Sequence, residues 1–282
     1  MKYEEAYKYG VLQLKNSNVG EAGLDARILL ESVCGVSMGD LYAHPDRLLS
    51  DAEEKQYLHF IARRCTREPL QYITGEQWFM GLRFTVNRDV LIPRQDTETL
   101  VETVMKELHD DMSVLDVCTG SGCILLSLLK YSNYCNGVGV DLSEAALNVA
   151  RTNAAELGIE ADFVQSDLFD NVKGRFDVIV SNPPYIATDE IGELEPEVKD
   201  YEPFMALDGM KDGLFFYRKI ISDAGTHLVP GGLLAFEIGC EQGEAVSGLL
   251  KAAGYIQIET VKDLCGLDRV VTGRKTVLED LK

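Results

Sequence analysis

The sequence predicts an α/β protein whose mostly parallel sheet carries helices on both faces, preceded by a small helical domain. From about residue 93 onward, strand-like runs alternate with helical patterns, which is the order that builds a parallel sheet. Residues 1 to about 70 show only helical periodicity. With 282 residues and 46% hydrophobic content, the chain can bury a full α/β core and a small second domain.

The N-terminal region predicts three helices, each with an apolar stripe at helical spacing. The stripes contain Tyr7, Val11 and Leu14, then Leu24, Ile28 and Leu29, then Leu58, Ile61 and Cys65. The run Ser50-Asp51-Ala52-Glu53 has the spacing of a capping box at the start of the third helix.

A short hairpin is expected between the helical region and the sheet. Residues 79–92 alternate poorly, but Phe84, Val86 and Val90 suggest two small strands there. We therefore expect a helical domain over residues 1–70, a β-hairpin linker over 71–92 and an α/β domain over 93–282.

In the α/β region, β-branched and apolar runs predict the strands and longer apolar stripes predict the helices. The expected strands are 113–118, 137–141, 161–165, 176–181 and 233–238. The expected helices are 123–129, 144–157 and 212–228. Gly158 stands where a helix over 144–157 would end.

The run Asn182-Pro183-Pro184-Tyr185 follows directly on the strand expected at 176–181. Two prolines cannot continue a strand ladder, so they hold the chain in a rigid turn at the carboxyl end of the strand. Open α/β sheets bind their ligands at that edge. Asn182, the carbonyl of Pro183 and the ring of Tyr185 are therefore candidates for binding, although a plain Pro-Pro turn would look the same.

The chemistry that suits this turn is transfer to a planar amino group. The nitrogen of an amide or a base amine is a poor nucleophile because its lone pair is delocalised. Two acceptors, the Asn182 side-chain oxygen and the Pro183 carbonyl, can each take one N–H and favour charge developing on that nitrogen. The Tyr185 ring can pack against the flat group.

A second candidate site follows the strand at 113–118. The segment from Cys118 through Thr119, Gly120, Ser121 and Gly122 turns into an apolar helix, an arrangement that cradles nucleotide-like ligands on backbone N–H groups. Asp141 ends the next strand, 19 residues after Gly122, where a carboxylate can bind the two hydroxyls of a ribose. A tight turn with a capping aspartate is the structural alternative.

The third strand, 161–165, leads into Asp167 and Leu168. Asp167 could accept from the amino group of an adenine while Leu168 covers the ring face. Alone, an aspartate in this place is more often a solvated turn residue.

Composition argues against several other classes. The net charge is −19, from 27 basic and 46 acidic residues, and proteins that neutralise many phosphates need basic surfaces. Residues 189–202 are especially acidic and resemble a solvated face beside the predicted target site. The seven cysteines form no C-x-x-C pair, so no disulfide framework or metal site is expected. Without a membrane span or an evident signal peptide, we expect a cytoplasmic protein.

Together the motifs resemble class I S-adenosylmethionine-dependent methyltransferases that act on amino groups. The resemblance rests on Asp116-x-x-x-Gly120-x-Gly122, Asp141, Asp167 and Asn182-Pro-Pro-Tyr185. It narrows to the bacterial peptide chain release factor glutamine methyltransferases through further runs between about residues 67 and 274. These runs are Arg67-Glu68-Pro69-Leu70-Gln71-Tyr72-Ile73-x-Gly75, residues 90–98, Asp212-Gly213-Leu214-x-x-Tyr217, Glu237-Ile238-Gly239 and Gly266-x-x-Arg269-Val270-Val271-x-Gly273-Arg274.

This resemblance implies a Rossmann-like, seven-stranded methyltransferase domain closed by an antiparallel pair at 254–260 and 269–272. It implies S-adenosylmethionine as cofactor, with residues 118–122 at its methionine end, Asp141 at the ribose, and Asp167 and Leu168 at the adenine. Asn182 borders both the cofactor and the target.

The implied target is the side-chain nitrogen (N5) of a glutamine in the Gly-Gly-Gln motif of a release factor. Asn182, Pro183, Pro184 and Tyr185 are its implied catalytic and substrate-binding residues, with Arg94 as a further substrate contact. The helical domain is implied to recognise the partner. We expect a monomer without a metal, a membrane or direct DNA binding. Cys118 departs from the family, which usually has glycine there.

Two other functions remain open at the level of the sequence. A nucleic-acid amino-methyltransferase, acting on adenine N6, could use the same Asn-Pro-Pro-Tyr turn but would want a basic target-recognition region, and residues 1–70 show no basic excess. A non-catalytic binding module on the same scaffold would be expected to have lost Asn182 or the glycine turn, and both are present.

Overall fold

The computed structural model describes residues 1–276 and divides them into two compact units. The smaller unit comprises Met1–Glu76 together with Glu195–Tyr201. The larger unit comprises Gln77–Leu194 and the chain from Glu202 onward. Segment 195–201 is therefore distant in sequence from the rest of its unit.

The smaller unit is helical and has its own apolar core. Its helices are α1 (Tyr3–Asn16), α2 (Ala22–Cys34), α3 (Met38–Ala43), α4 (Asp51–Cys65), α5 (Leu70–Thr74) and α9 (Pro196–Lys199). The capping box expected at Ser50 is confirmed, because Ser50 and Glu53 each bind the other's backbone N–H.

Most of the expected apolar stripes belong to the core of the smaller unit. Leu14, Leu29 and Ile61 are buried, and Tyr7, Val11 and Cys65 pack against them. The prediction is wrong at Leu24, which is exposed.

Small residues complete the buried faces. In α1 the buried residues are Tyr3, Ala6, Gly10 and Leu14. Ala6 and Gly10 let the helices approach closely, and they carry almost no hydrophobic signal of their own.

The two-stranded hairpin consists of β1 (Glu76–Phe79) and β2 (Leu82–Thr85). It lies earlier than residues 79–92 because the turn is at Met80 and Gly81, which both have positive φ. Two such residues match the twist of a tight hairpin. Val86 and Val90 are buried as expected but belong to no strand.

The larger unit contains a seven-stranded sheet in the order β5-β4-β3-β6-β7-β9-β8, which confirms the predicted fold class. Its strands are β3 (Ser113–Val117), β4 (Asn136–Asp141), β5 (Asp162–Gln165), β6 (Phe176–Ser181), β7 (Leu228–Glu237), β8 (Ile256–Lys262) and β9 (Asp268–Arg274). Strands β3 to β7 pair in parallel, and β9 pairs antiparallel with both β7 and β8. The closing antiparallel pair is therefore confirmed.

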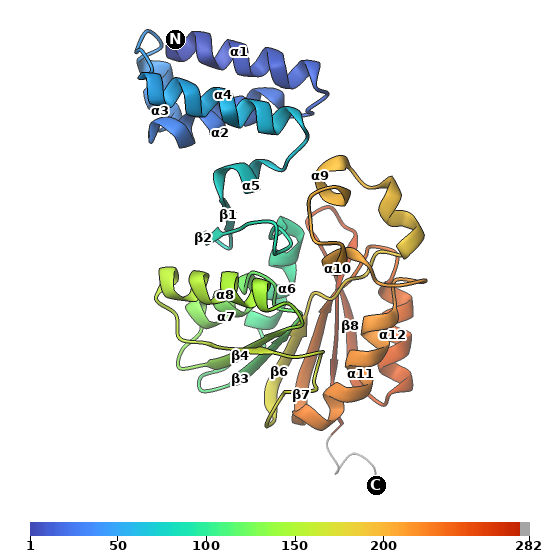
Figure 1. Cartoon of the computed structure of the whole chain (residues 1–282). Coiled ribbons are helices and arrows are strands. Elements are labelled where there is room, and N and C mark those ends of the chain that lie inside the picture. The colour runs from blue at the N-terminus through green and yellow to red at the C-terminus, as the bar shows by residue number, and fades with distance from the viewer. Residues whose placement is uncertain (277–282) are drawn as a thin grey trace. The chain divides into compact units, whose positions relative to one another are not determined.

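Helices cover both faces of this sheet (Figure 1). They are α6 (Glu98–Met105), α7 (Cys123–Tyr131) and α8 (Glu144–Leu157) on one face, and α11 (Phe215–His227) and α12 (Gly243–Ala252) on the other. Alternate residues of each strand enter the two cores. In β3, for example, Val114 packs with α6 and α7, whereas Leu115 packs with α11.

Short elements complete the larger unit: η1 (Gln95–Thr97), η2 (Thr188–Glu193) and α10 (Phe204–Leu207). Helix α11 begins later than residue 212, because Asp212 accepts the N–H of Leu214 and Gly213 has a φ of 68°. Helix α8 ends at Gly158 as predicted.

The strand order reverses between β3 and β6. The chain runs outward from β3 to β4 and β5 and then returns to pair β6 with β3. Such a switch point opens a crevice at the carboxyl ends of the strands, where open α/β sheets bind ligands.

Candidate functional site

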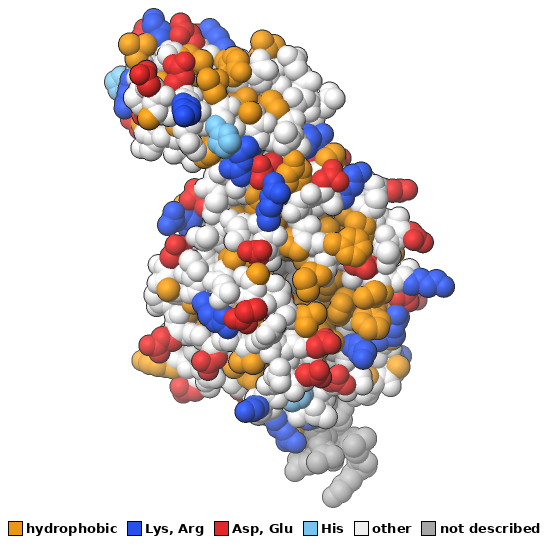
Figure 2. Space-filling model, in the orientation of Figure 1, with side chains coloured by type: hydrophobic (Ala, Val, Ile, Leu, Met, Phe, Trp, Pro, Cys, Tyr) orange, Lys and Arg blue, Asp and Glu red, His pale blue; other side chains and the backbone are white. Residues whose placement is uncertain are grey.

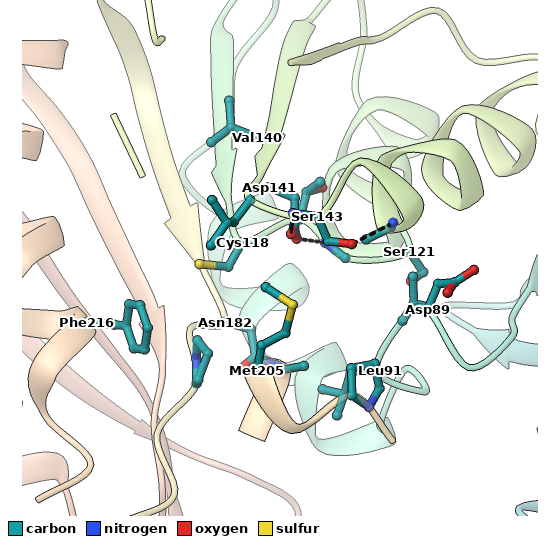
Figure 3. Close-up of a pocket in the computed structure, with 18 of the residues that line it drawn as sticks. Asp89, Leu91, Cys118, Ser121, Val140, Asp141, Ser143, Asn182, Met205 and Phe216 are labelled. Atoms are coloured by element: carbon teal, nitrogen blue, oxygen red, sulfur yellow. Dashed lines mark hydrogen bonds between the residues drawn. The ribbon is translucent and has the colours of Figure 1, made fainter. Parts of the chain in front are cut away.

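A cavity of about 340 Å³ lies at this switch point, and all of its lining residues belong to the larger unit. Its walls come from the segments that follow β3, β4, β5 and β6, together with residues 89–97 and 203–216. Figure 3 shows Cys118, Asp141 and Asn182 around the same space. This volume is in the range of small-molecule and cofactor sites.

In the loop 118–122, Cys118, Thr119, Gly120 and Ser121 line one side of the cavity, whereas Gly122 does not and faces Ala150 and Leu126 instead. Cys118, Gly120 and Gly122 have φ values of 63°, 55° and 78°, so the chain turns sharply between β3 and α7. A Cβ at Gly120 would meet no protein atom within 4 Å, and Gly120 lines the cavity, so its open side is available to a ligand. Cys118 adopts a conformation that favours glycine.

Asp116 supports this loop through a hydrogen bond but does not line the cavity. Its Oδ2 accepts a hydrogen bond from the Thr119 hydroxyl at 2.6 Å, while Oδ1 has no partner among the described residues. Burial raises the pKa of the Asp116 carboxyl to about 7, because the charged form loses its hydration. Asp116 is thus a support for the loop.

Asp141 closes the same side at the end of β4. Its two oxygens accept the backbone N–H groups of Gly120 and Ser143, each at 2.9 Å. These bonds fix the carboxylate at the cavity, where Asp141 is half-buried. Burial raises the pKa of Asp141, and the two N–H donors oppose that rise.

Asp167 and Leu168 line the far end of this side. Leu168 has a φ of 48°, a positive value that is uncommon for a side chain of this size. The apolar side chains Val140, Leu142 and Ala146 line the cavity as well. A flat apolar ring flanked by polar atoms would suit these surroundings.

The opposite side of the cavity is the Asn182–Tyr185 turn. Asn182 and Pro184 line the cavity, whereas Pro183 and Tyr185 do not. The Asn182 amide nitrogen contacts Thr97 Oγ1 at 3.5 Å, which leaves the amide oxygen as an acceptor. The Tyr185 hydroxyl instead points to Glu237, donating to Oε1 at 3.3 Å.

Arg94 lines the cavity beside this turn. Its guanidinium is paired with Glu202, with 2.5 Å between Nη2 and Oε1. Glu202 is buried, and burial raises the pKa of its carboxyl although Arg94 opposes the rise. The pair sets the direction of the Arg94 side chain at the mouth of the cavity.

The pattern of the sequence did not reveal several lining residues. Thr97, Met205 and Phe216 lie around Asn182, as Figure 3 shows for the latter two. Met205 belongs to α10 and is exposed, as are Phe204 and Met210. Figure 2 shows hydrophobic side chains gathered on the larger unit in the region of α10. Two of these residues had a signal nearby. Thr97 lies within the motif 90–98, and Phe216 is next to Tyr217 of the Asp212-Gly213-Leu214-x-x-Tyr217 motif.

The acidic run 189–202 was expected to be a solvated face, but only part of it is exposed. Glu197 pairs with Arg64 at 2.9 Å and with Arg67 at 2.5 Å, all within the smaller unit. Glu202 is buried against Arg94. These carboxylates therefore serve as ion-pair partners. The sequence pattern did not show this, because the arginines that they bind lie more than 100 positions earlier in the chain.

Neither a metal-binding cluster nor a helix that could span a membrane is found among the described residues. Within residues 1–276, no cluster of three or more His, Cys, Asp or Glu side chains could hold a metal ion. In the same part of the chain, no helix combines the length and apolar character needed to cross a bilayer.

Comparison with known protein families places two models on this chain. Residues 5–75 match the model of the PrmC N-terminal domain, and residues 94–194 match the model of the methyltransferase small domain. In the structure, the first range lies in the smaller unit and the second in the larger unit.

Characterised relatives are similar over nearly the whole chain. The release factor glutamine methyltransferase of Geobacter sulfurreducens is 43% identical, covering 93% of this chain and 92% of that protein. The relative of the same name from Clostridium acetobutylicum is 42% identical, covering 96% and 98%. A solved methyltransferase from Pyrococcus furiosus, at 20% identity and a TM-score of 0.54 over 71% of this chain and 91% of that one, shares the fold. With relatives this similar at full length, the chain belongs to the release factor glutamine methyltransferase family.

Proposed function

We propose that this enzyme transfers a methyl group from S-adenosylmethionine to the side-chain nitrogen (N5) of the glutamine in the Gly-Gly-Gln motif of a release factor. One observation carries the assignment to this site: residues 118–121, Asp141 and Asn182 line a single cavity. A methyl donor and an amide held on the two sides of this cavity would be neighbours. Family membership supports the choice of substrate.

The cavity suits a cationic donor. Four carboxylates line it, Asp89, Asp141, Asp167 and Asp208, against one guanidinium, which is paired with Glu202. When bound, S-adenosylmethionine supplies an electrophilic methyl group on a positively charged sulfur. An acidic surround favours that charge, so the residues present fit this donor.

We assign the donor's parts to residues as follows. Residues 118–122 would hold the methionine end, with Gly120 leaving room for it. Asp141 would accept the ribose hydroxyls, because each of its oxygens takes only one backbone N–H and keeps a further lone pair. Asp167 would accept from the adenine amino group, and Leu168 would cover the ring.

The target amide would be held by acceptors of the Asn182–Tyr185 turn. Asn182 Oδ1 and the Pro183 carbonyl would each take one N–H and favour positive charge developing on nitrogen. The contact of the Asn182 amide nitrogen with Thr97 supports this orientation. Tyr185 would pack against the amide plane, Pro184 would border it, and Arg94 would contact the substrate at the mouth.

No dedicated general base is required. The target nitrogen carries a surplus proton after the transfer, and a protonated amide is acidic enough to release it to water. Most of the rate enhancement is then expected from positioning the reacting groups and from the two acceptors.

We further propose that the helical unit recognises the release factor. Its surface carries exposed apolar side chains, among them Leu12, Tyr42 and Leu48. We also propose that the enzyme acts in the cytoplasm as a monomer. Direct DNA binding is not expected at a net charge of −19.

The decisive experiment offers radiolabelled S-adenosylmethionine with purified release factor and with duplex DNA in parallel. Peptide mass mapping should place the label on the glutamine of the Gly-Gly-Gln motif, and Asn182→Ala should abolish most of it. Label on DNA alone would keep the amino-group chemistry and overturn the partner. Label on neither would favour a binding module. Size-exclusion chromatography with light scattering tests the monomer.

A further inference from the structure

Tyr185, the last residue of the Asn182–Tyr185 turn, is held at both of its polar ends. Its hydroxyl donates to Glu237 Oε1 at 3.3 Å. Its carbonyl accepts from Gln242 Nε2 at 3.0 Å. Glu237 ends β7 and Gln242 precedes α12, so both contacts come from segments more than 50 positions further along the chain.

The Gln242 side chain uses both of its N–H groups and its oxygen. Besides Tyr185, its Nε2 donates to the Gly213 carbonyl at 3.3 Å. Its Oε1 accepts the Gly239 N–H at 3.0 Å. The Tyr217 hydroxyl lies 3.4 Å from Oε1 but donates at 2.9 Å to the Glu237 carbonyl. These three bonds restrict the amide and join the turn to the segments around residues 213 and 239.

The backbone around Tyr185 has little room to move. A Cβ at Gly213 would lie 2.3 Å from the Tyr185 carbonyl oxygen, and one at Gly209 would lie 2.7 Å from Tyr185 Cα. Real Cβ atoms do not approach so closely, so these positions need glycine. The carbonyl is therefore enclosed where Gln242 reaches it.

Glu237 supports the turn through one of its two oxygens. Its side chain is almost completely buried. Oε1 accepts the Tyr185 hydroxyl, whereas Oε2 has no hydrogen-bond partner among the described residues. Burial raises the pKa of Glu237 to about 7, while the Thr97 hydroxyl and the charge of Arg269 oppose the rise. Glu237 therefore bears on the turn directly at Tyr185.

We propose that Glu237 and Gln242 are positioning residues for methyl transfer. They act through Tyr185 and hold the Asn182–Tyr185 turn in the orientation that the target amide requires. Both lie outside the cavity lining and act only through another residue, so they are positioning residues and not catalytic ones. The expected fall in kcat rests on the proposed function. The expected loosening of the turn rests on hydrogen bonding alone.

The kinetic test uses Gln242→Met and Glu237→Gln, which keep the side-chain size and remove the key donor or charge. We expect kcat to fall roughly 10- to 100-fold, since a displacement of about 1 Å can cost two orders of magnitude. The dissociation constant of S-adenosylmethionine, measured by titration calorimetry, should change less than about 3-fold. The matched controls are Gln257→Met and Glu259→Gln, two exposed residues of β8, which should behave as wild type.

A double-mutant cycle separates positioning from general stability. Combined with Tyr185→Phe, Glu237→Gln should add little to the loss in kcat, because both changes act on the same hydrogen bond. Tyr185→Phe removes its donor, and Glu237→Gln removes the charge of its acceptor. Additive losses would show that Glu237 does not act through Tyr185. Equal weakening of cofactor binding and kcat would mean that the whole site had been disturbed, which contradicts the proposal.

A structural measurement keeps this inference independent of the substrate. Hydrogen exchange of the Ile186 and Gly209 amides, which bond to Leu207 and Ile186 at 3.1 and 2.8 Å, should accelerate in Gln242→Met. Unchanged exchange would overturn the role of Gln242 even if release factor were not methylated. Should Gln242→Met fail to fold, Gln242→Glu retains the shape and the acceptor oxygen and provides the same comparison.

Discussion

The two sides of the cavity are built differently. On the cofactor side, short loops follow consecutive strands and are fixed by bonds of short and medium range. The Thr119–Asp116 and Ser143–Asp141 bonds span 3 and 2 positions, and the Gly120–Asp141 and Asn153–Ser121 bonds span 21 and 32. On the target side, Asn182 and Tyr185 are supported by Thr97, Glu237 and Gln242, from 52 to 85 positions away. Binding of a common cofactor needs local geometry, whereas orienting one amide nitrogen needs support from several elements at once.

Removing the acceptor on the target side should have the largest effect. Asn182→Ala should lower kcat by roughly 10²- to 10³-fold, the scale for one preorganised polar contact, while the affinity for S-adenosylmethionine stays near wild type. Single-turnover methylation of release factor and titration calorimetry measure the two quantities. Asn133→Ala, at an exposed position, is the control. A variant that turned over at the wild-type rate would refute the role of Asn182.

Removing the carboxylate on the cofactor side should give the reverse pattern. Asp141→Ala should weaken S-adenosylmethionine binding about 10- to 100-fold, since hydrogen bonds to a charged group contribute about 1.5–3 kcal/mol. The substitution also leaves the N–H groups of Gly120 and Ser143 without the carboxylate that accepts them. Calorimetry gives the dissociation constant, with exposed Asp162→Ala as the control. An unchanged constant would break the ribose assignment.

Each side of the cavity is also supported by one buried carboxyl group, that of Asp116 on the cofactor side and that of Glu237 on the target side. Such groups predict that the stability of the protein depends on pH. Burial raises the pKa of Asp116 and of Glu237 to about 7 in the folded state, well above the usual values near 4. The folded protein therefore binds more protons between about pH 4 and 7, and stability should fall as pH rises through that window.

Asp116→Asn should flatten this fall in a series of thermal melts between pH 5 and 8. Each kcal/mol corresponds to about 2–4 °C in Tm for a chain of this size. Exposed Asp110→Asn should leave the slope unchanged. A slope that persisted at full size in both Asp116→Asn and Glu237→Gln would place its origin in other groups.

The smallest effect is expected at Cys118. Its φ of 63° favours glycine, so Cys118→Gly should stabilise the protein by up to about 1 kcal/mol. Differential scanning calorimetry would record a Tm a few degrees higher. Cys240→Gly, at a position without positive φ, should be neutral or destabilising. A lower Tm for Cys118→Gly would show that packing of the thiol outweighs the backbone strain.

Local patterns were sufficient for the fold of the larger unit and for the places of its polar loops. Gly120, Asp141 and Asn182 each stand at the carboxyl end of an apolar run, and parallel strands bring such ends to one edge. Resemblance to a family added the closing antiparallel pair, which no periodicity distinguishes from other strands. The roles proposed for these side chains remain predictions.

Long-range partners could not be predicted in the same way. Thr97 lies within the motif 90–98, and Gln242 follows Gly239 of another motif by three residues. Neither was predicted, because their contacts with Asn182 and Tyr185 arise only on folding.

The acidic run was misjudged only in part. Glu197 and Glu202 are ion-paired with Arg64 and Arg94, which lie far upstream. In the smaller unit, the alanine and glycine contacts of the helices were missed because these residues carry little hydrophobic signal.

The helical unit is discontinuous in sequence, and this affects how it can be exchanged or isolated. A fragment that stopped at residue 76 would lack α9 and leave Arg64 and Arg67 without Glu197. Conversely, the remaining chain would keep a loop whose carboxylates had lost their cationic partners. A chimera with the helical unit of a relative must therefore transplant residues 195–201 together with residues 1–76, as one genetic module in two pieces.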